Sequence, residues 1–141
     1  MTTTPGPRQN SPSAIQSSSS PSASVYWLNL DQVRRDLKKA VERLAHEHTE
    51  IEEVWLFGSL ARGDAVPGSD ADLLVLLRDS RSSFLDRMVQ YQPDFCGVGV
   101  DVFAYTRAEV ARMQAEGNTF VRGAQSEGIL LFQRSTQNPQ R

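Results

Sequence analysis

The sequence has one cysteine, no long hydrophobic run and no excess of basic charge, and each of these absences excludes a class of protein. With Cys96 alone the chain forms no internal disulfide, and no base stands beside it to activate the thiol, so we expect a buried, inert cysteine. No apolar run approaches the ~20 residues that a membrane helix needs, and the N-terminus lacks the apolar core of a secretory signal. We therefore expect a cytoplasmic protein with no membrane partner. A formal net charge of −2 argues against direct nucleic-acid binding.

The 141 residues suffice for one domain with one modest core. Residues 1–24 consist largely of Ser, Thr and Pro, and such a segment buries too little apolar area to offset its ordering entropy, so we expect a disordered tail. A docking or phosphorylation segment is the alternative for this stretch. We expect the folded domain at 25–133 and a polar C-terminal tail at 134–141.

Hydrophobic periodicity predicts helices that alternate with strands. Asp31 is expected to cap a first helix, whose apolar stripe recurs at three- and four-residue spacing through Ala45. Arg34 and Arg35 lie largely off this stripe, so a solvated face is expected rather than a phosphate contact. The other expected elements are strands at 53–57, 70–77, 98–105 and 129–132, a short helix at 60–62, a helix capped by Ser80 or Ser82, and a helix opened by a Thr106–Glu109 capping box that pauses at 117–118 and resumes to Gly128. This alternation indicates an α/β or α+β fold.

Two carboxylates open the strongest predicted strand. Asp70 and Asp72 are two residues apart, so both project from the same face, and Leu74 and Leu76 continue that face. Adjacent carboxylates raise each other's pKa unless a cation joins them, and hard oxygen ligands of this kind suit Mg²⁺ or Mn²⁺. The alternative is a strand whose first turn is merely wet and acidic.

A third carboxylate interrupts the next predicted strand. Asp101 stands between Val100 and Val102, and burying such an acid without a partner costs several kcal/mol. A salt bridge to an arginine would satisfy Asp101, and so would a metal shared with Asp70 and Asp72. Three carboxylates on adjacent strands can hold two metal ions ~3.5–4 Å apart, the arrangement used for in-line phosphoryl transfer.

A glycine–serine pair lies where a predicted strand gives way to a helix. Backbone N–H groups at such a place bind anions, and Gly58 lets the backbone approach a phosphate closely. Ser59 adds a hydroxyl donor and is also a candidate cap. Arg62, one turn on, reaches a phosphate or a nearby acid, and Ser69 is a further polar candidate. Taken alone, the pair also fits an ordinary turn with a helix cap.

Taken together, these motifs resemble the signature of the minimal nucleotidyltransferases within the DNA polymerase beta-like superfamily. Gly58-Ser59 and Asp70-Ala71-Asp72 are separated by ten residues, and Val100-Asp101-Val102 matches the family's third carboxylate strand. The resemblance covers about residues 28–132. It implies a small mixed β-sheet backed by helices, the nucleotidyltransferase fold. Asp70 and Asp72 would bind two Mg²⁺ ions, Asp101 would bind the catalytic metal and help to deprotonate the attacking hydroxyl, and Gly58 and Ser59 would hold the β- and γ-phosphates of ATP.

The resemblance also implies a partner. Stand-alone proteins of this family are similar to the antitoxin half of toxin–antitoxin pairs, in which the antitoxin adenylylates a hydroxyl of an all-helical HEPN ribonuclease. We therefore expect transfer of AMP from ATP to a HEPN-type toxin. Two alternatives stay open, namely nucleotidyl transfer to a small molecule such as an aminoglycoside, and a non-enzymatic antitoxin that acts by binding alone.

Overall fold

The computed structural model describes residues 29–135, so the predicted tail at 1–24 lies outside the described residues, and the predicted domain boundaries stay predictions. Within 29–135 no helix has both the length and the apolar character to cross a bilayer. The elements follow in the order α2 (Leu30–Glu47), β1 (Ile51–Phe57), α3 (Ser59–Arg62), β2 (Ala71–Leu77), α4 (Phe84–Gln90), β3 (Val100–Thr106), α5 (Arg107–Ala115), α6 (Phe120–Glu127) and β4 (Ile129–Gln133).

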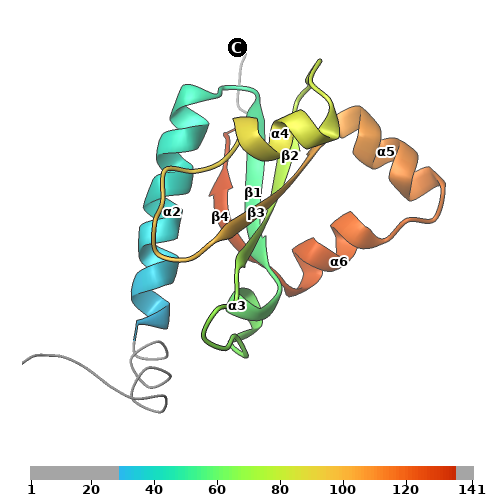
Figure 1. The fold of residues 1–141 in the computed structure, drawn as a ribbon. Helices are drawn as coiled ribbons and strands as arrows, with labels where there is room; N and C mark the ends of the chain where they lie inside the picture. The colour runs from blue at the N-terminus through green and yellow to red at the C-terminus, as the bar shows by residue number, and fades with distance from the viewer. Residues whose placement is uncertain (1–28, 136–141) are drawn as a thin grey trace, which may run out of the picture.

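The four strands form one mixed sheet in the order β3-β2-β1-β4. β1 is antiparallel to both β2 and β4, whereas β2 and β3 are parallel. The long helix α2 lies on one side of the sheet, and α5 and α6 lie on the other (Figure 1). The expected α/β architecture, a small mixed sheet backed by helices, is confirmed.

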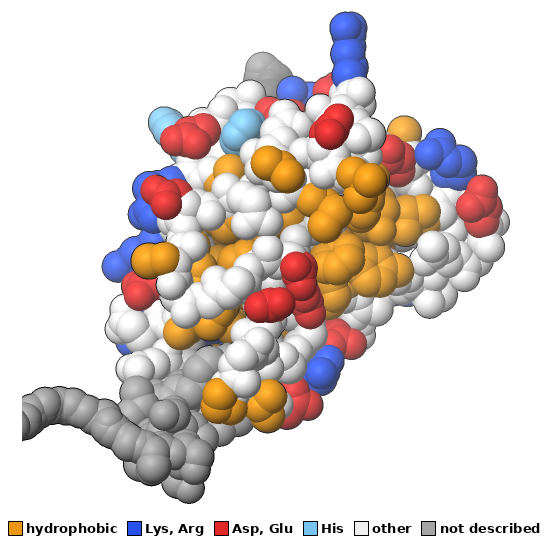
Figure 2. All heavy atoms as spheres, viewed as in Figure 1, with side chains coloured by type: hydrophobic (Ala, Val, Ile, Leu, Met, Phe, Trp, Pro, Cys, Tyr) orange, Lys and Arg blue, Asp and Glu red, His pale blue; other side chains and the backbone are white. Residues whose placement is uncertain are grey.

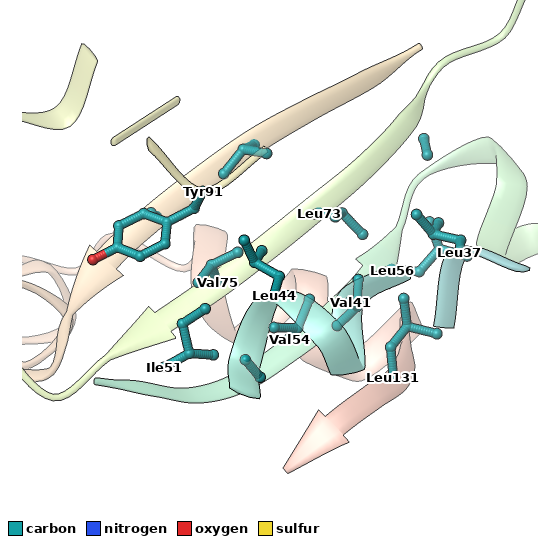
Figure 3. Close-up of a cluster of buried hydrophobic side chains, with 14 of the residues drawn as sticks. Leu37, Val41, Leu44, Ile51, Val54, Leu56, Leu73, Val75, Tyr91 and Leu131 are labelled. Atoms are coloured by element: carbon teal, nitrogen blue, oxygen red, sulfur yellow. The ribbon is translucent and has the colours of Figure 1, made fainter. Parts of the chain in front are cut away.

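The main core lies between α2 and the sheet. Leu37, Val41 and Leu44 of α2 meet Val54 of β1 and Val75 of β2 in this cluster (Figure 3). Full burial of each such side chain stabilises the fold by about 1.5–3 kcal/mol. The predicted apolar stripe of the first helix is therefore confirmed as the surface that docks α2 on the sheet.

A second cluster covers the opposite face of the sheet. Leu74 of β2 is fully buried there against Val121 and Ala124 of α6, and partly buried aromatic residues surround it. Since successive strand residues point to opposite faces, β2 needs apolar residues at both even and odd positions. This burial on two faces explains the unbroken Leu-Leu-Val-Leu-Leu run.

Several element ends differ from the predicted ones. Asn29 rather than Asp31 precedes the first helix, and Asp31 lies in the first turn with a carboxylate oxygen 3.9 Å from Arg34. Ser83, not Ser80 or Ser82, caps α4, because its hydroxyl accepts the Asp86 N–H at the i+3 spacing that capping requires.

The expectation of a buried Cys96 is wrong. Cys96 is exposed in the segment that joins α4 to β3. Connecting segments run over the surface because their backbone polar groups need water, and this overrides the usual preference of a free thiol for the core.

The helical hairpin after β3 agrees with the prediction. Thr106 and Glu109 form the expected capping box of α5. The chain then turns at Gly117, whose φ of 83° favours glycine, and resumes as α6. This turn brings α6 back beside the sheet edge at which β1 ends.

Candidate active site

Three strand ends meet at one edge of the sheet. β1 ends at Phe57, and its antiparallel neighbour β2 begins there, with Phe57 paired to Asp72. β3 runs parallel to β2 and begins at the same edge, with Asp72 paired to Asp101. The topology therefore brings together the three segments that carry the predicted site residues.

Asp72 and Asp101 are direct partners in the parallel ladder. Residues paired in this way point to the same face, and neighbouring strands lie about 4.8 Å apart. That face is the one covered by α5 and α6. Leu74, two residues after Asp72, belongs to the second cluster, and Phe103, two residues after Asp101, contacts the rings of Phe57 and Phe120. Figure 2, which has α2 on the left and α5 and α6 on the right as in Figure 1, shows acidic side chains below an apolar region of the surface.

The three acids differ in exposure, and none of them forms an ion pair within residues 29–135. Asp72 is half-buried, whereas Asp70 and Asp101 are exposed. Among residues 29–135, no Lys, Arg or His forms an ion pair with any of the three. The alternative of an arginine salt bridge at Asp101 is therefore absent from the described part of the chain.

Negative charge accumulates at Asp72. Burial raises the pKa of its carboxyl above the usual range, and the charges of Asp101 and Asp70 raise this pKa further, while Arg62 opposes the shift. The charges of Asp70 and Asp101 thus act on the carboxyl of Asp72, as expected for acids that lie close together. A bound cation would relieve this repulsion.

Two glycines make room for the acids. Gly58 has φ 78°, a value that side chains disfavour, and a Cβ placed there would overlap the carboxylate of Asp72. At Gly99 a Cβ would lie 2.5 Å from a carboxylate oxygen of Asp70, and the Gly99 carbonyl accepts the Ala71 N–H at 2.8 Å. Gly99 was not among the predicted site residues, although a glycine at the start of a predicted strand signals close approach.

The turn after β1 is fixed by a side chain from α2. α3 begins at Ser59 and is preceded by Gly58, and no side-chain hydrogen bond caps it, so Ser59 does not have the predicted capping role. The Arg34 guanidinium donates from Nε to the Leu60 carbonyl at 2.9 Å and from Nη2 to the Ala61 carbonyl at 3.3 Å. Arg34 was expected on a solvated face. Contacts 26 and 27 residues apart leave no signal in local periodicity.

A cleft of about 520 Å³ opens beside this turn. One wall of the cleft is formed by Phe57 and by four residues of the predicted motifs, namely Gly58, Ser59, Arg62 and Asp72. The other wall comes from α6 and comprises Thr119, Phe120, Gly123, Ala124 and Glu127. Gly58, Ser59, Arg62 and Asp72 are predicted site residues, whereas the predicted Ser69, Asp70 and Asp101 do not line this cleft. The α6 wall was not predicted, because nothing in the α6 sequence shows which face meets the β1 turn.

Arg62 and Ser69 have structural partners. Arg62 lines the cleft and pairs with Asp64 at 3.2 Å and with Glu127 at 3.0 Å. The Ser69 hydroxyl accepts the Val66 N–H at 3.0 Å within the loop before β2. Arg62 is therefore placed at the cleft, while Ser69 is occupied in its own turn.

The donor set has the chemistry of a magnesium site. Asp70, Asp72 and Asp101 offer only carboxylate oxygens, the ligands that Mg²⁺ prefers, and the raised pKa of Asp72 shows where a cation would relieve repulsion. Among residues 29–135, no three His, Cys, Asp or Glu side chains converge tightly enough to hold a metal ion between them. Joint coordination would need the carboxylates of Asp70, Asp72 and Asp101 to come closer together than they stand in this structure.

Comparison with known proteins adds to this geometry. Residues 35–122, more than half of the chain, match the model of a family described as "Nucleotidyltransferase domain". The crystal structure of a "putative nucleotidyltransferase" from Sulfolobus solfataricus is 26% identical, with a TM-score of 0.54 over 75% of this chain and 85% of that one. A crystal structure of a toxin–antitoxin with AMP-PNP is 15% identical, with a TM-score of 0.46 over 69% of this chain and 73% of that one, a likeness too slight to support an inference. No curated protein matches the sequence.

Proposed function

Because the chain belongs to the nucleotidyltransferase domain family, we propose that it transfers AMP from ATP to a hydroxyl group with the help of two Mg²⁺ ions. The observation that carries this proposal is the pairing of Asp72 with Asp101 across the parallel ladder, beside the Gly58 turn. Asp70, Asp72 and Asp101 are the residues that would hold the metal, and Mn²⁺ offers the same ligand chemistry. The bound ions would neutralise the triphosphate and stabilise charge that develops during transfer.

The chain's own residues have separate tasks in this reaction. The backbone N–H groups of the Gly58–Ser59 turn and the Ser59 hydroxyl bind the β- and γ-phosphates. Asp101, exposed at the sheet edge, accepts the proton of the attacking hydroxyl. The hydroxyl oxygen forms a bond to the α-phosphorus, the bond between that phosphorus and the bridging oxygen to the β-phosphate breaks, and pyrophosphate leaves with the bond's electron pair.

The acceptor hydroxyl belongs to a partner protein in this proposal. Asp70 and Asp101 are exposed, so the acidic edge is open to a macromolecule. The motif resemblance favours a HEPN-type toxin whose hydroxyl side chain receives AMP and which is thereby neutralised, which makes this protein its antitoxin. Transfer to an aminoglycoside-like small molecule and neutralisation by binding alone are the competing outcomes.

Transfer of label from ATP tests the chemistry. The protein is incubated with Mg²⁺, a HEPN-type partner and ATP labelled at the α- or the γ-phosphate. We expect α-label to join the partner and γ-label to leave in pyrophosphate. Asp72→Asn and Asp101→Asn should abolish transfer. Asp79→Asn, which removes an exposed carboxylate just beyond the other end of β2, should retain it. Full activity of Asp72→Asn would exclude the metal-assisted mechanism.

Intact-mass spectrometry of the co-expressed partner tests the acceptor. We expect added AMP on the partner with the wild-type protein and none with Asp72→Asn. A partner that is neutralised but unmodified would favour binding alone. In the assay with α-labelled ATP, an added aminoglycoside that takes up the label while the partner stays unlabelled would favour the small-molecule reaction.

A further inference from the structure

Gly123 lies at a position where neither the backbone conformation nor the packing requires a glycine. It lies inside the eight-residue helix α6, where glycine is less favourable than alanine by about a factor of five in helix formation. It is not among the glycines with positive φ, and a Cβ built on it would meet nothing within 4 Å. The usual structural reasons for a glycine are therefore missing.

Gly128, five residues later, shows the contrast. A Cβ there would collide with the Ala124 carbonyl and lie 2.8 Å from the Leu56 carbonyl oxygen, so backbone packing explains that glycine. At Gly123 the space is open, and the residue lines the cleft. A larger side chain at the exposed Gly123 would therefore extend into the cleft.

The residues around Gly123 form a surface suited to a flat, polar-edged ring. Thr119, Gly123 and Glu127 are spaced four apart and so share one side of α6. Phe120 lines the cleft beside them, and its ring is held by Phe57 at 5.5 Å and Phe103 at 5.7 Å between centroids. Thr119 precedes the helix without a side-chain capping bond, which leaves its hydroxyl available for a ligand.

We propose that the α6 wall, defined as Thr119, Phe120, Gly123 and Glu127, seats the nucleoside of the triphosphate, with the base against Phe120 and over Gly123. This inference rests on the proposed function and deepens it by assigning the half of the cleft that the phosphates do not use. Gly58, Ser59 and Asp72 line the opposite wall of the same cleft, so one triphosphate can contact both walls. A volume of about 520 Å³ lies within the ~300–1,000 Å³ typical of small-molecule sites.

Charge at the cleft mouth fits this seat. Glu127 pairs with Arg62 across the two walls at 3.0 Å, with both side chains about half exposed. An arriving triphosphate competes for Arg62, which frees the Glu127 carboxylate to accept a hydrogen bond from a ribose hydroxyl or a base amine.

The test compares Mg²⁺–ATP with Mg²⁺–tripolyphosphate, which has the phosphates but no nucleoside. Binding of each to the full chain is measured by calorimetry for the wild type, Gly123→Leu and Gly123→Ala. We expect Gly123→Leu to weaken ATP binding about tenfold or more, the range for loss of a base–aromatic contact, and to change tripolyphosphate binding less than about twofold. Gly123→Ala should retain most ATP affinity and raise Tm, since a methyl group fills little of the cleft and favours the helix.

Ser126→Leu is the matched control, because it adds the same side chain to an exposed position of α6 that does not line the cleft. It should leave both affinities unchanged. A general loss of fold would remove tripolyphosphate binding as well, so a selective loss of ATP binding identifies the nucleoside seat.

Unchanged ATP affinity in Gly123→Leu would overturn the inference while leaving the proposed function intact. If Gly123→Leu loses both ligands, the more flexible Gly123→Met decides in the same assay, and loss of both ligands there too would show a structural position and overturn the inference. Failure of the wild type to bind either ligand would contradict the proposed function itself.

Discussion

Gly58 and Asp72 approach each other so closely that a single methyl group at Gly58 would overlap the Asp72 carboxylate. Gly58 directly follows Phe57, the last residue of β1, and Phe57 is the ladder partner of Asp72 in β2. The phosphate turn and the metal acid of the proposed site are thus one packed unit. Mutating the turn should disturb the acid even where the acid itself is unchanged.

Gly58→Ala should destabilise the fold by about 1–3 kcal/mol, because it combines a disfavoured φ of 78° with the collision at Asp72. Gly68→Ala is the control, since Gly68 also has a positive φ but nothing lies within 4 Å of its added Cβ. Thermal melts of both variants separate strain from collision, at roughly 4–8 °C per kcal/mol. Equal losses in the two variants would contradict the close-contact interpretation.

Asp72→Asn should raise the Tm of the metal-free protein at neutral pH, because it removes a half-buried charge that Asp101 and Asp70 repel. The folded-state pKa of Asp72 is raised, so its ionised form opposes folding at neutral pH. This penalty fades as pH falls through the folded pKa towards the unfolded value near 3.9. Melts in EDTA from neutral pH to about pH 4 should therefore converge. A lower Tm for Asp72→Asn at neutral pH would make the acid structural.

With Mg²⁺–ATP in place of EDTA, the wild type should have a higher Tm than Asp72→Asn. A ligand that binds only the folded state stabilises it by RT ln(1 + [L]/Kd), about 2.7 kcal/mol at a hundredfold excess over Kd. The wild type should gain this term, and Asp72→Asn should gain little of it. Asp79→Asn, which lacks an exposed carboxylate away from the acidic edge, should shift like the wild type. If Mg²⁺–ATP shifts none of the three proteins, the chain has no triphosphate site.

Local sequence patterns were sufficient to predict part of the candidate site. Alternation in a strand predicts Asp70 and Asp72 on one face, although β2 begins at Ala71, one residue after Asp70. The glycine before a short helix marks the turn. Asp101 was predictable for the same reason, because an acid between two valines breaks a strand pattern. The parallel ladder then pairs it with Asp72.

The rest depends on contacts between distant segments. Arg34 reaches the α3 carbonyls from 26 residues away, and Gly123 enters the cleft only because α5 and α6 fold back on the sheet. Neither placement follows from hydrophobic periodicity, which reports one element at a time. Cys96 shows the reverse case, in which a residue preference pointed to the core and a connecting segment put the thiol on the surface.

Glu109→Gln should lower stability at neutral pH by about 1.5–3 kcal/mol, the range for hydrogen bonds to charged groups. Glu109 accepts two hydrogen bonds from the buried Arg87, at 2.6 and 3.0 Å, and these lower the pKa of its carboxyl. A lowered pKa means that the contribution is complete above the unfolded value near 4.3 and is lost as pH falls through the folded pKa.

Urea melts at pH 7 and at successively lower pH check this. The wild type should lose its advantage over Glu109→Gln as the solution becomes acidic. Glu116→Gln, at the exposed C-terminal end of α5, should follow the wild type throughout. A wild-type advantage that persists at the lowest pH would show that charge at Glu109 is not its source.

Arg34→Met should impair nucleotide binding more than it impairs stability, because Arg34 holds the α3 carbonyls and thereby positions the Gly58–Ser59 turn. Methionine retains much of the aliphatic stem, so the change removes mainly the hydrogen bonds and should cost about 1–2 kcal/mol of folding free energy. Arg35→Met removes the neighbouring exposed guanidinium, which donates to Gln32 one turn back, and serves as the control. We expect the KM for ATP to rise several-fold in Arg34→Met and to stay near the wild-type value in Arg35→Met. Equal KM values in the two variants, with a lower Tm in Arg34→Met alone, would restrict Arg34 to a purely structural role, because a displaced turn must bind phosphate less well.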